Sequence, residues 1–193
     1  MSKLNQEQEN FFDYYILKNI VEPLSPYIYK AGIKPNLLTL LGLITGIIGN
    51  YHLYNYQSAY FSIYFLLSQV FDDSDGYIAR KYNMSSTFGD YFDHISDFIK
   101  ISLFFYILFT RYNLIQYKFI IIYFVIHLLL LFTFVGFQET VSKYKEHNTI
   151  LQINRLFCYG NPEDNIKFFK YFGSGSFIVM CILIANYLYM KRT

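Results

Sequence analysis

The sequence predicts an all-α integral membrane protein, and three observations support this fold class. Of the 193 residues, 54% are hydrophobic and only 16% are charged, a balance more apolar than that of most soluble domains. Apolar residues gather in long runs, several of them near the roughly 20 residues that a helix needs to cross a bilayer. Six of the eight aspartates fall in one short polar stretch between two such runs. The length fits one domain, so we treat residues 1–193 as a single membrane domain.

An amphipathic helix is expected before the first apolar run. Apolar residues recur at roughly helical spacing from Phe11 to Val21, with polar residues between them. This pattern favours a helix over residues 7–22 that lies in the membrane interface, although a helix packed on its own protein would show the same pattern. The first ten residues are polar and do not resemble a secretory signal. Three prolines are expected to break the chain before the first span: Pro23, Pro26 and Pro35.

Five membrane helices are predicted in order along the chain: residues 37–54, 58–82, 88–110, 117–138 and 172–190. The apolar parts of the second and third are only half to two-thirds of a span, so both helices must continue into the polar stretch between them. Residues 139–171 are too polar for an obvious span, but a further helix is possible within them.

The placement of lysine and arginine predicts the orientation in the membrane. Basic residues precede the first span, follow the second and follow the fourth, which puts these three helix ends on the cytosolic side. Arg111 and Lys118 go against this trend. Lys191 and Arg192 would share the cytosolic side only if a sixth span lies within residues 139–171. The polar stretch with the aspartates, and any active site there, should therefore face the cytosol.

The spacing of the aspartates predicts two helix faces that meet. Asp72, Asp75, Gly76 and Ala79 share one face, because they are spaced at i, i+3, i+4 and i+7. A second face, one connecting segment later, holds Gly89, Asp93 and Asp97. The remaining two acids of the stretch are less well placed: Asp73 falls off the first face, and Asp90 could lie near the site without being a ligand.

Four carboxylates on these faces would form an all-oxygen metal site. A charged side chain near the bilayer interior costs at least about 2.5 kcal/mol, so it usually faces a cavity and has a function. Carboxylate ligands suit Mg²⁺, Mn²⁺ or Ca²⁺, and two such ions about 3.5–4 Å apart could clamp a diphosphate. The small residues on the same faces would leave room for a flat nucleotide. Structural ion pairs with Arg80, Lys81 and Lys100 are the alternative, but three cations cannot neutralise six acids.

The stretch from Asp72 to Asp97 reads D-x2-D-G-x2-A-R-x8-G-x3-D-x3-D. This string resembles the signature of the CDP-alcohol phosphotransferases, with every fixed position present. The segment from Lys34 to Gly42 also resembles the entry of that family into its first span. The resemblance implies six membrane helices around a polar cavity open to the cytosol, usually in a homodimer. Five clear spans are one fewer than this fold has.

The resemblance also implies a role for each residue of the motif. Two divalent ions, Mg²⁺ or Mn²⁺, would be held by Asp72, Asp75, Asp93 and Asp97. Asp97 would also act as the general base on the acceptor hydroxyl. The CDP site would be lined by Gly76, Ala79 and Gly89, and Arg80 would orient carboxylates or contact phosphate. The implied reaction is attack of an alcohol on the β-phosphorus of a CDP-alcohol, with release of CMP.

The prediction of the substrates depends on a resemblance of only three residues. Phe92-Asp93-His94 resembles the F-D-H of choline and ethanolamine phosphotransferases, which combine CDP-choline or CDP-ethanolamine with diacylglycerol. Family members closer to this length more often combine CDP-diacylglycerol with inositol, serine or glycerol phosphate, and this alternative stays open. His94 either assists Asp97 in proton transfer or is a polar neighbour of the cavity.

Other classes of protein fit the sequence less well. A divalent-cation transporter would usually carry matching polar sites in both halves, whereas the acids here lie in one segment. An inactive membrane scaffold would be expected to have lost a motif aspartate, and none is lost. The long apolar run from Phe119 to Phe137 argues against a soluble helical module. The net charge of +2 predicts no nucleic-acid partner, and Cys158 and Cys181 form neither a metal motif nor a disulfide framework.

Overall fold

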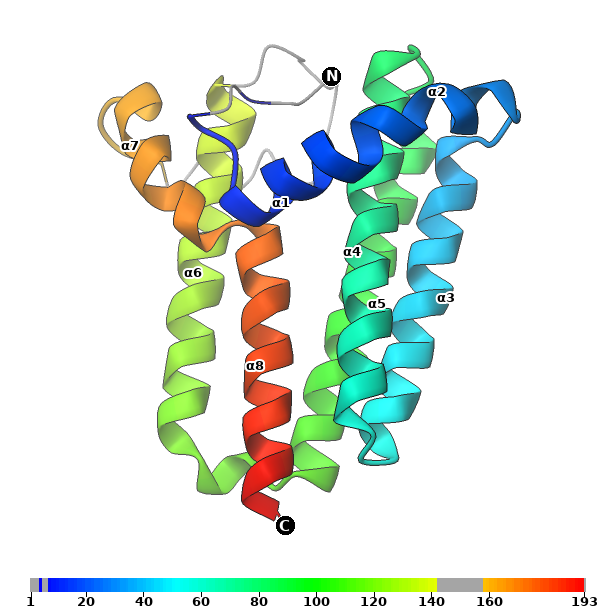
Figure 1. Ribbon diagram of the computed structural model, residues 1–193. Helices are drawn as coiled ribbons and strands as arrows, with labels where there is room; N and C mark the ends of the chain where they lie inside the picture. The colour runs from blue at the N-terminus through cyan, green and yellow to red at the C-terminus, as the bar shows by residue number, and fades with distance from the viewer. Residues whose placement is uncertain (1–3, 5–6, 142–157, 193) are drawn as a thin grey trace.

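The computed structural model describes residues 4, 7–141 and 158–192, and every regular element within these residues is helical. Five long helices run roughly parallel to one axis (Figure 1): α3 Pro35–Tyr54, α4 Ser58–Lys81, α5 Thr87–Arg111, α6 Lys118–Val141 and α8 Ser174–Arg192. Their ranges agree with the five predicted membrane helices to within a few residues. The all-α fold class is therefore confirmed.

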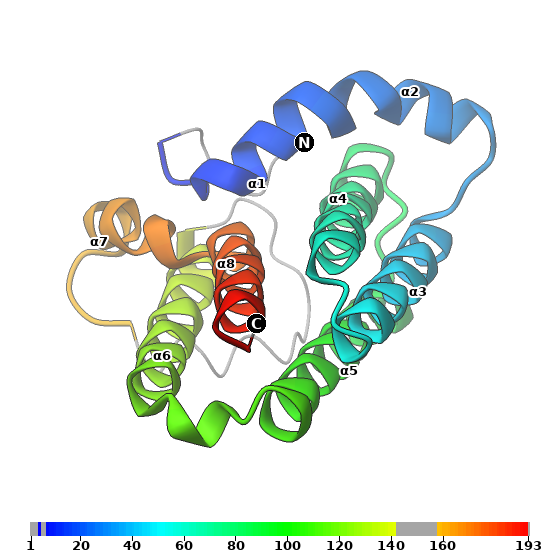
Figure 2. The same ribbon diagram turned by 60° about the horizontal axis from the view of Figure 1, so that its bottom comes forward.

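The N-terminal helix lies across one end of the bundle (Figures 1 and 2). It consists of α1 Phe11–Ile16, a π-helical turn at Leu17–Val21 and α2 Glu22–Lys30. Asn10 caps its start, because the Asn10 side chain accepts hydrogen bonds from the backbone N–H groups of Phe12 and Asp13. A helix is thus present where the apolar spacing predicts one. Its place in a membrane interface remains a prediction.

The expectation that Pro23 and Pro26 break the chain is wrong, because both prolines lie within α2. Proline has no N–H to donate to the carbonyl four residues earlier, which leaves the Glu22 carbonyl without its usual partner below Pro26. The hydroxyl of Ser25 donates to that carbonyl at 2.9 Å. A side-chain hydrogen bond therefore replaces the missing backbone bond, and the helix continues to Lys30.

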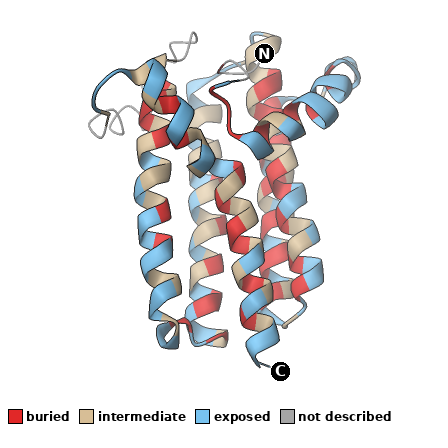
Figure 3. Ribbon diagram, turned by 60° about the vertical axis from the view of Figure 1, so that its left-hand side comes forward, coloured by how far each residue is buried: buried red, intermediate tan, exposed pale blue. Residues whose placement is uncertain are grey.

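Within the described residues, three stretches are long and apolar enough to cross a membrane: α3, α6, and Pro162–Arg192, which includes α8. Helices α4 and α5 have 24 and 25 residues, enough length to cross, but their ends near the α4–α5 connection carry the acidic residues. Much of the outward side of the long helices is exposed (Figure 3). The exposed residues include many large apolar side chains, such as Phe119 and Ile126. These features support a location in a membrane.

The structure does not establish a sixth span. Most of the region proposed for it, residues 142–157, lies outside the described residues. Helix α7, Pro162–Phe169, has 8 residues, or about 12 Å of helix, which is too short to cross a bilayer. The C-terminus, with Lys191 and Arg192, lies at the end of the bundle opposite the N-terminal helix (Figure 1). The placement of these two residues on the side of the aspartates, which depended on a sixth span, therefore gains no support.

Close packing of α3 on α4 and α5 positions the polar residues of these helices. Glycines on α3 let the neighbouring helices approach: a Cβ at Gly49 would lie 3.3 Å from the backbone nitrogen of Phe65. The Ser68 hydroxyl donates to the Gly42 carbonyl at 2.8 Å. Phe61, Phe65 and Phe104 stack nearby in the buried core.

On the other side of the molecule, α6 and α8 lie next to each other (Figure 2).

Candidate active site

A cavity of about 1170 Å³ lies between helices α3, α4 and α5 on one side and helices α6 and α8 on the other. Its lining comes from the N-terminal helix, all five long helices and the α4–α5 connection. One wall, on α4 and α5, carries the carboxylates of the motif. The opposite wall is mostly apolar and comes from α6 and α8: Leu128, Leu131, Phe132, Val135, Phe177 and Ile178. Ligand sites commonly have about 300–1,000 Å³, so this space is large enough for two substrates together.

Three of the predicted metal ligands meet in this cavity. Asp72 on α4 and Asp93 and Asp97 on α5 each offer one carboxylate oxygen, and these oxygens lie within 4.8 Å of one another. The short connection between the helices makes this meeting possible. Ser86 ends that connection as the N-cap of α5, and its hydroxyl accepts a hydrogen bond from the backbone N–H of Gly89.

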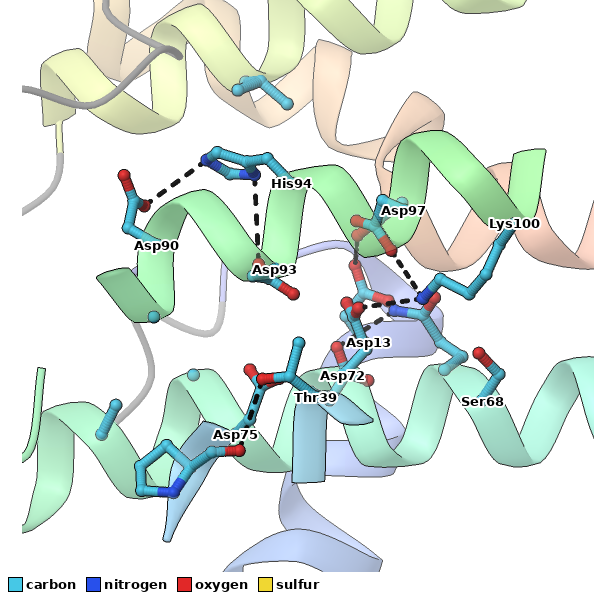
Figure 4. A pocket seen from close by; sticks show the side chains of 18 of the residues that line it. Asp13, Thr39, Ser68, Asp72, Asp75, Asp90, Asp93, His94, Asp97 and Lys100 are labelled. Carbon is cyan, nitrogen blue, oxygen red and sulfur yellow. Dashed lines mark hydrogen bonds and ion pairs between the residues drawn. The ribbon is translucent and has the colours of Figure 1, made fainter. Parts of the chain in front are cut away.

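Lys100 on α5 forms ion pairs with two of these carboxylates (Figure 4). Its Nζ lies 2.6 Å from Asp97 Oδ1 and 3.3 Å from Asp72 Oδ1. The side chain passes over α3 at Gly46, where a Cβ would lie only 2.6 Å from Lys100 Cδ. Asn50 on α3 donates to the Lys100 carbonyl at 3.1 Å. Sequence analysis placed Lys100 only among possible ion-pair partners and missed its position inside the cluster.

The fourth predicted ligand, Asp75, lies in the same cavity but has another partner. Its Oδ2 accepts a hydrogen bond of 2.5 Å from the hydroxyl of Thr39 on α3. Asp75 does not belong to the trio of oxygens within 4.8 Å of one another. Sequence analysis did not identify Thr39 as a site residue, because its contact with Asp75 joins residues 36 apart in the chain.

His94 faces two other acids of the motif region. Its Nε2 lies 3.4 Å from Asp90 Oδ1 and its Nδ1 lies 4.0 Å from Asp93 Oδ2 (Figure 4). Asp90 also lines the cavity, so it lies near the site without belonging to the trio of Asp72, Asp93 and Asp97. His94 lines the cavity, and its contacts are with Asp90 and Asp93.

The predicted nucleotide-site residues Gly76, Ala79, Arg80 and Gly89 all line the cavity. The Arg80 guanidinium lies over Gly76, where a Cβ would be 3.0 Å from one of its nitrogens. A Cβ at Gly89 would lie 2.9 Å from Oδ1 of Asn36, at the start of α3. Each glycine thus permits a close approach of a polar side chain to the helix backbone.

Further carboxylates, which sequence analysis did not assign to the site, line the same cavity. Asp73 follows Asp72 on α4, Asp13 lies on α1, and Glu9 lies in the turn before α1. Asp13 Oδ2 accepts a hydrogen bond of 2.8 Å from the hydroxyl of Ser174 at the start of α8. No motif or helical spacing connects residues of the N-terminal helix to the acidic stretch, so the sequence alone gave no signal for this group.

The donor atoms fit a hard divalent cation. Every ligand in the trio is a carboxylate oxygen, and Asp93 Oδ1 is buried without a hydrogen-bond partner among the described residues. A buried carboxylate oxygen without a partner is costly, and a bound cation would remove that cost. Mg²⁺ and Mn²⁺ prefer such oxygen ligands.

Comparisons with known proteins identify relatives of the chain. Residues 33–188 match a family model described as CDP-alcohol phosphatidyltransferase. A protein of Aquifex aeolicus (strain VF5), described as "Uncharacterized protein", is 32% identical over 97 residues. That match covers 50% of this chain and 47% of the relative, so the chain spans about half the length of the curated relative it matches. No solved structure matches the chain significantly.

Proposed function

Because this chain belongs to the CDP-alcohol phosphatidyltransferase family, we propose that it is a metal-dependent membrane transferase of phospholipid synthesis. It moves a substituted phosphate from a CDP-alcohol to an acceptor alcohol and releases CMP. The observation that carries this proposal is the cavity itself, with a wall of carboxylates opposite an apolar wall. Such a cavity suits a metal-bound diphosphate on one side and a lipid chain on the other.

The carboxylates of Asp72, Asp93 and Asp97 are the proposed ligands of the divalent cations, with Asp75 as a fourth. When bound, these cations supply positive charge that stabilises the phosphate oxygens and the departing CMP. The chain's own residues hold the substrates in line. Gly76 and Gly89 line the proposed nucleotide site, and Arg80, whose guanidinium lies over Gly76, is the proposed phosphate contact.

Asp97 is the proposed general base. Its side chain is 46% exposed, against 20% for Asp72 and 29% for Asp93, so it is the most accessible of the trio to an incoming hydroxyl. The acceptor oxygen forms a bond to the β-phosphorus while the bond from that phosphorus to the oxygen of CMP breaks. The hydroxyl proton passes to the Asp97 carboxylate. Lys100, 2.6 Å away, holds that carboxylate in place. His94 is a candidate to assist this proton transfer through Asp93.

The proposed substrates are CDP-choline or CDP-ethanolamine with diacylglycerol, from the Phe92-Asp93-His94 match. The alternative is CDP-diacylglycerol with inositol, serine or glycerol phosphate. The proposed arrangement in the cell is a multi-pass membrane homodimer with the cavity open to the cytosol. The basic residues around the acidic end favour this orientation.

The test is CMP release by purified full-length protein in lipid nanodiscs with Mg²⁺ or Mn²⁺. Diacylglycerol is supplied with CDP-choline or CDP-ethanolamine, and separately CDP-diacylglycerol with each small alcohol. Release that requires the metal and one matched pair supports the proposal. If metal and CDP bind but no pair reacts, either the acceptor is an alcohol that was not supplied or the chain is an inactive scaffold. If Mn²⁺ crosses vesicle membranes through the protein without CMP release, the chain is a cation transporter.

A further inference from the structure

The end of the bundle opposite the aspartates carries positive charge that the proposed reaction does not use. Three parts of the chain meet there (Figure 1): the α3–α4 turn, the α5–α6 connection and the end of α8. The sequence has no Asp or Glu in residues 23–71, 98–138 or 165–193, which contain these parts. The cationic side chains at this end are Arg111, Lys118, Lys191 and Arg192. A carboxylate at the chain terminus would still leave three positive charges.

Two of these cations share one aromatic ring. The guanidinium carbon of Arg111 lies 4.7 Å from the centre of the Tyr56 ring, and that of Arg192 lies 3.1 Å from the same point. The two guanidinium carbons are therefore no farther apart than the sum of these distances. No carboxylate forms an ion pair with either arginine in the part of the chain that the structure describes. Two like charges this close repel each other, and an anion bound by both would offset the repulsion.

The backbone holds the Tyr56 ring in place at some cost. Tyr56 has a φ of 60°, in the left-handed region, where a bulky side chain is strained. Strained backbone of this kind gathers at binding and catalytic sites. The Tyr56 hydroxyl donates to the Arg111 carbonyl at 3.4 Å, and Arg111 Nε donates to the Tyr54 carbonyl at 3.4 Å. The α3–α4 turn is thus tied to the end of α5, which positions Arg111 before any ligand binds.

The guanidinium groups suit a phosphate ligand. Each guanidinium has five N–H donors, and the hydrogen bond to Tyr54 uses only one of those in Arg111. A cation–π contact with Tyr56 does not require any of the others. The planar fork of arginine matches two oxygens of one phosphate. Because Arg111 is partly exposed and Arg192 is exposed, a ligand from outside the protein can reach both.

The surroundings favour a phosphate that is carried by a lipid. Ile115 in the α5–α6 connection is 70% exposed, and Phe119 near the start of α6 is 76% exposed. Tyrosines also gather at this end, as they do where lipid chains meet head groups: Tyr51, Tyr54, Tyr56, Tyr112 and Tyr117. In a bilayer, the apolar side chains would contact acyl chains while the two arginines lie at the depth of the head groups.

We propose that Arg111 and Arg192, on either side of their shared contact with Tyr56, bind the phosphate of an anionic phospholipid. The site lies at the end of the bundle away from the acidic cavity, so this lipid is not the substrate, and the proposal does not depend on the transfer reaction. Arg192 is on α8, whereas Arg111 is on α5. The bound lipid therefore links the two sides of the cavity and should stabilise the bundle. It also gives a reason for the basic residues that depart from the topology pattern.

The test compares the full-length protein in nanodiscs of phosphatidylcholine alone with nanodiscs of equal parts phosphatidylcholine and phosphatidylglycerol. Metal ions and CDP-alcohols are left out. The Tm should be higher in the mixed nanodiscs, because the anionic lipid binds the folded state. Native mass spectrometry of the detergent-purified protein should show phosphatidylglycerol retained in preference to phosphatidylcholine. Arg111→Gln and Arg192→Gln should each weaken this binding by about tenfold or more and reduce the rise in Tm.

Lys191→Gln is the matched control. It removes the same charge one residue before Arg192, but the Lys191 ammonium lies over the Tyr187 ring and not over Tyr56. This variant should keep most of the preference for phosphatidylglycerol. Circular dichroism verifies the fold of each variant, and the two arginine variants keep the test decisive if one of them fails to fold.

Three results would overturn the lipid site. One is equal retention of the two lipids by the wild type. Another is an equal loss of binding in Lys191→Gln and Arg192→Gln, which would show a diffuse charge effect without a site. The third is displacement of phosphatidylglycerol by free glycerol phosphate at the same concentration, which would show a site for a soluble anion. Because no arm measures CMP release, failure of the transfer reaction would leave each of these results unchanged.

Discussion

At the scale of single residues, the carboxylates of the cavity differ because each has a different neighbour. Thr39 holds Asp75, Lys100 bridges Asp72 and Asp97, and Ser174 holds Asp13. Identical side chains thus have different surroundings, and the proposed roles of metal ligand and proton acceptor fall on carboxylates with different partners. Three predictions follow the roles of Asp97, Asp13 and Asp93.

Replacing Asp97 tests its role as the base. Asp97→Asn removes the proton acceptor while it keeps the size of the side chain, so CMP release should fall by about 10²–10⁴-fold, the usual contribution of general-base catalysis. Binding of the CDP-alcohol, measured by radioligand displacement, should change far less. Activity near that of the wild type would exclude Asp97 as the base. Asp164→Asn on the exposed side of α7 is the matched control.

Replacing Asp13 tests the cost of burying it. Burial raises the pKa of Asp13 from 3.8 to about 6, although the hydrogen bond from Ser174 lowers it. The unfolded chain has the lower value, so the charged form costs the folded state about 3 kcal/mol above pH 6 and nothing well below pH 4. Asp13→Asn removes this cost. The variant should therefore have a higher Tm than the wild type at pH 8, and the difference should shrink as the pH falls toward 4.

Thermal unfolding of ligand-free protein at pH 8 and pH 4.5 measures this effect. A variant that is less stable than the wild type at pH 8 would contradict it. A gain in stability on removal of the buried charge is the pattern expected of a residue that is retained for function.

Replacing Asp93 tests the metal site separately from catalysis. A ligand that binds only the folded state raises its stability, so Mn²⁺ should raise the Tm of the wild type. Asp93→Asn removes one oxygen of the trio and should weaken Mn²⁺ binding by about tenfold or more, with a smaller rise in Tm at the same Mn²⁺ concentration. Addition of a chelator should reverse the rise in the wild type. An equal rise in both proteins would exclude Asp93 as a ligand.

At the scale of helices, α3 controls the position of Lys100 on α5. The side chain of Lys100 can lie against α3 only because residue 46 has no Cβ. The same helix supplies Thr39 to Asp75 and Asn50 to the backbone of α5. Helix α3 carries no acid of the cluster, yet it holds Asp75 directly through Thr39 and acts on Asp72 and Asp97 through the position of Lys100.

Gly46→Ala tests this packing. The new methyl group would lie 2.6 Å from Lys100 Cδ, so the lysine or the helix must shift, at a cost of about 1–3 kcal/mol. We expect a lower Tm in nanodiscs and altered Mn²⁺ binding, because the shift disturbs the ion pairs with Asp72 and Asp97. Gly42→Ala on the same helix is the matched control, since its Cβ would have nearest contacts of 3.4 Å. Equal effects of the two substitutions would show that Gly46 has no special role.

The helices and the acidic faces could be predicted from the sequence because both depend on local spacing. Helices α4 and α5 lie at 58–81 and 87–111, against predicted ranges of 58–82 and 88–110. Asp93 and Asp97 are one turn apart and do meet Asp72. Thr39, Lys100 and Asp13 could not be assigned in this way, because their contacts depend on how separate helices pack. The break expected at Pro26 was wrong because the rule that proline ends a helix does not consider neighbouring side chains. Here the Ser25 hydroxyl donates the hydrogen bond that Pro26 cannot donate.

At the scale of the whole molecule, the two groups of helices differ in chemistry. Helices α3, α4 and α5 carry the motif, whereas α6 and α8 provide most of the apolar wall (Figures 1 and 2). The N-terminal helix crosses the end of the bundle and brings Asp13 to the cavity. The cavity thus has one polar and one apolar wall, which suits the proposed reaction between a nucleotide and a lipid.

The ion pairs of Lys100 have a consequence for how the protein matures. Six acids within one short stretch would repel one another strongly in a newly made chain that has not yet met a metal ion. The Lys100 ammonium already lies between Asp72 and Asp97, so part of that repulsion is offset by the polypeptide itself. If the cluster binds metal ions as proposed, the bundle should be able to assemble in the bilayer before the ions bind, and a shortage of metal should then lower activity without causing misfolding.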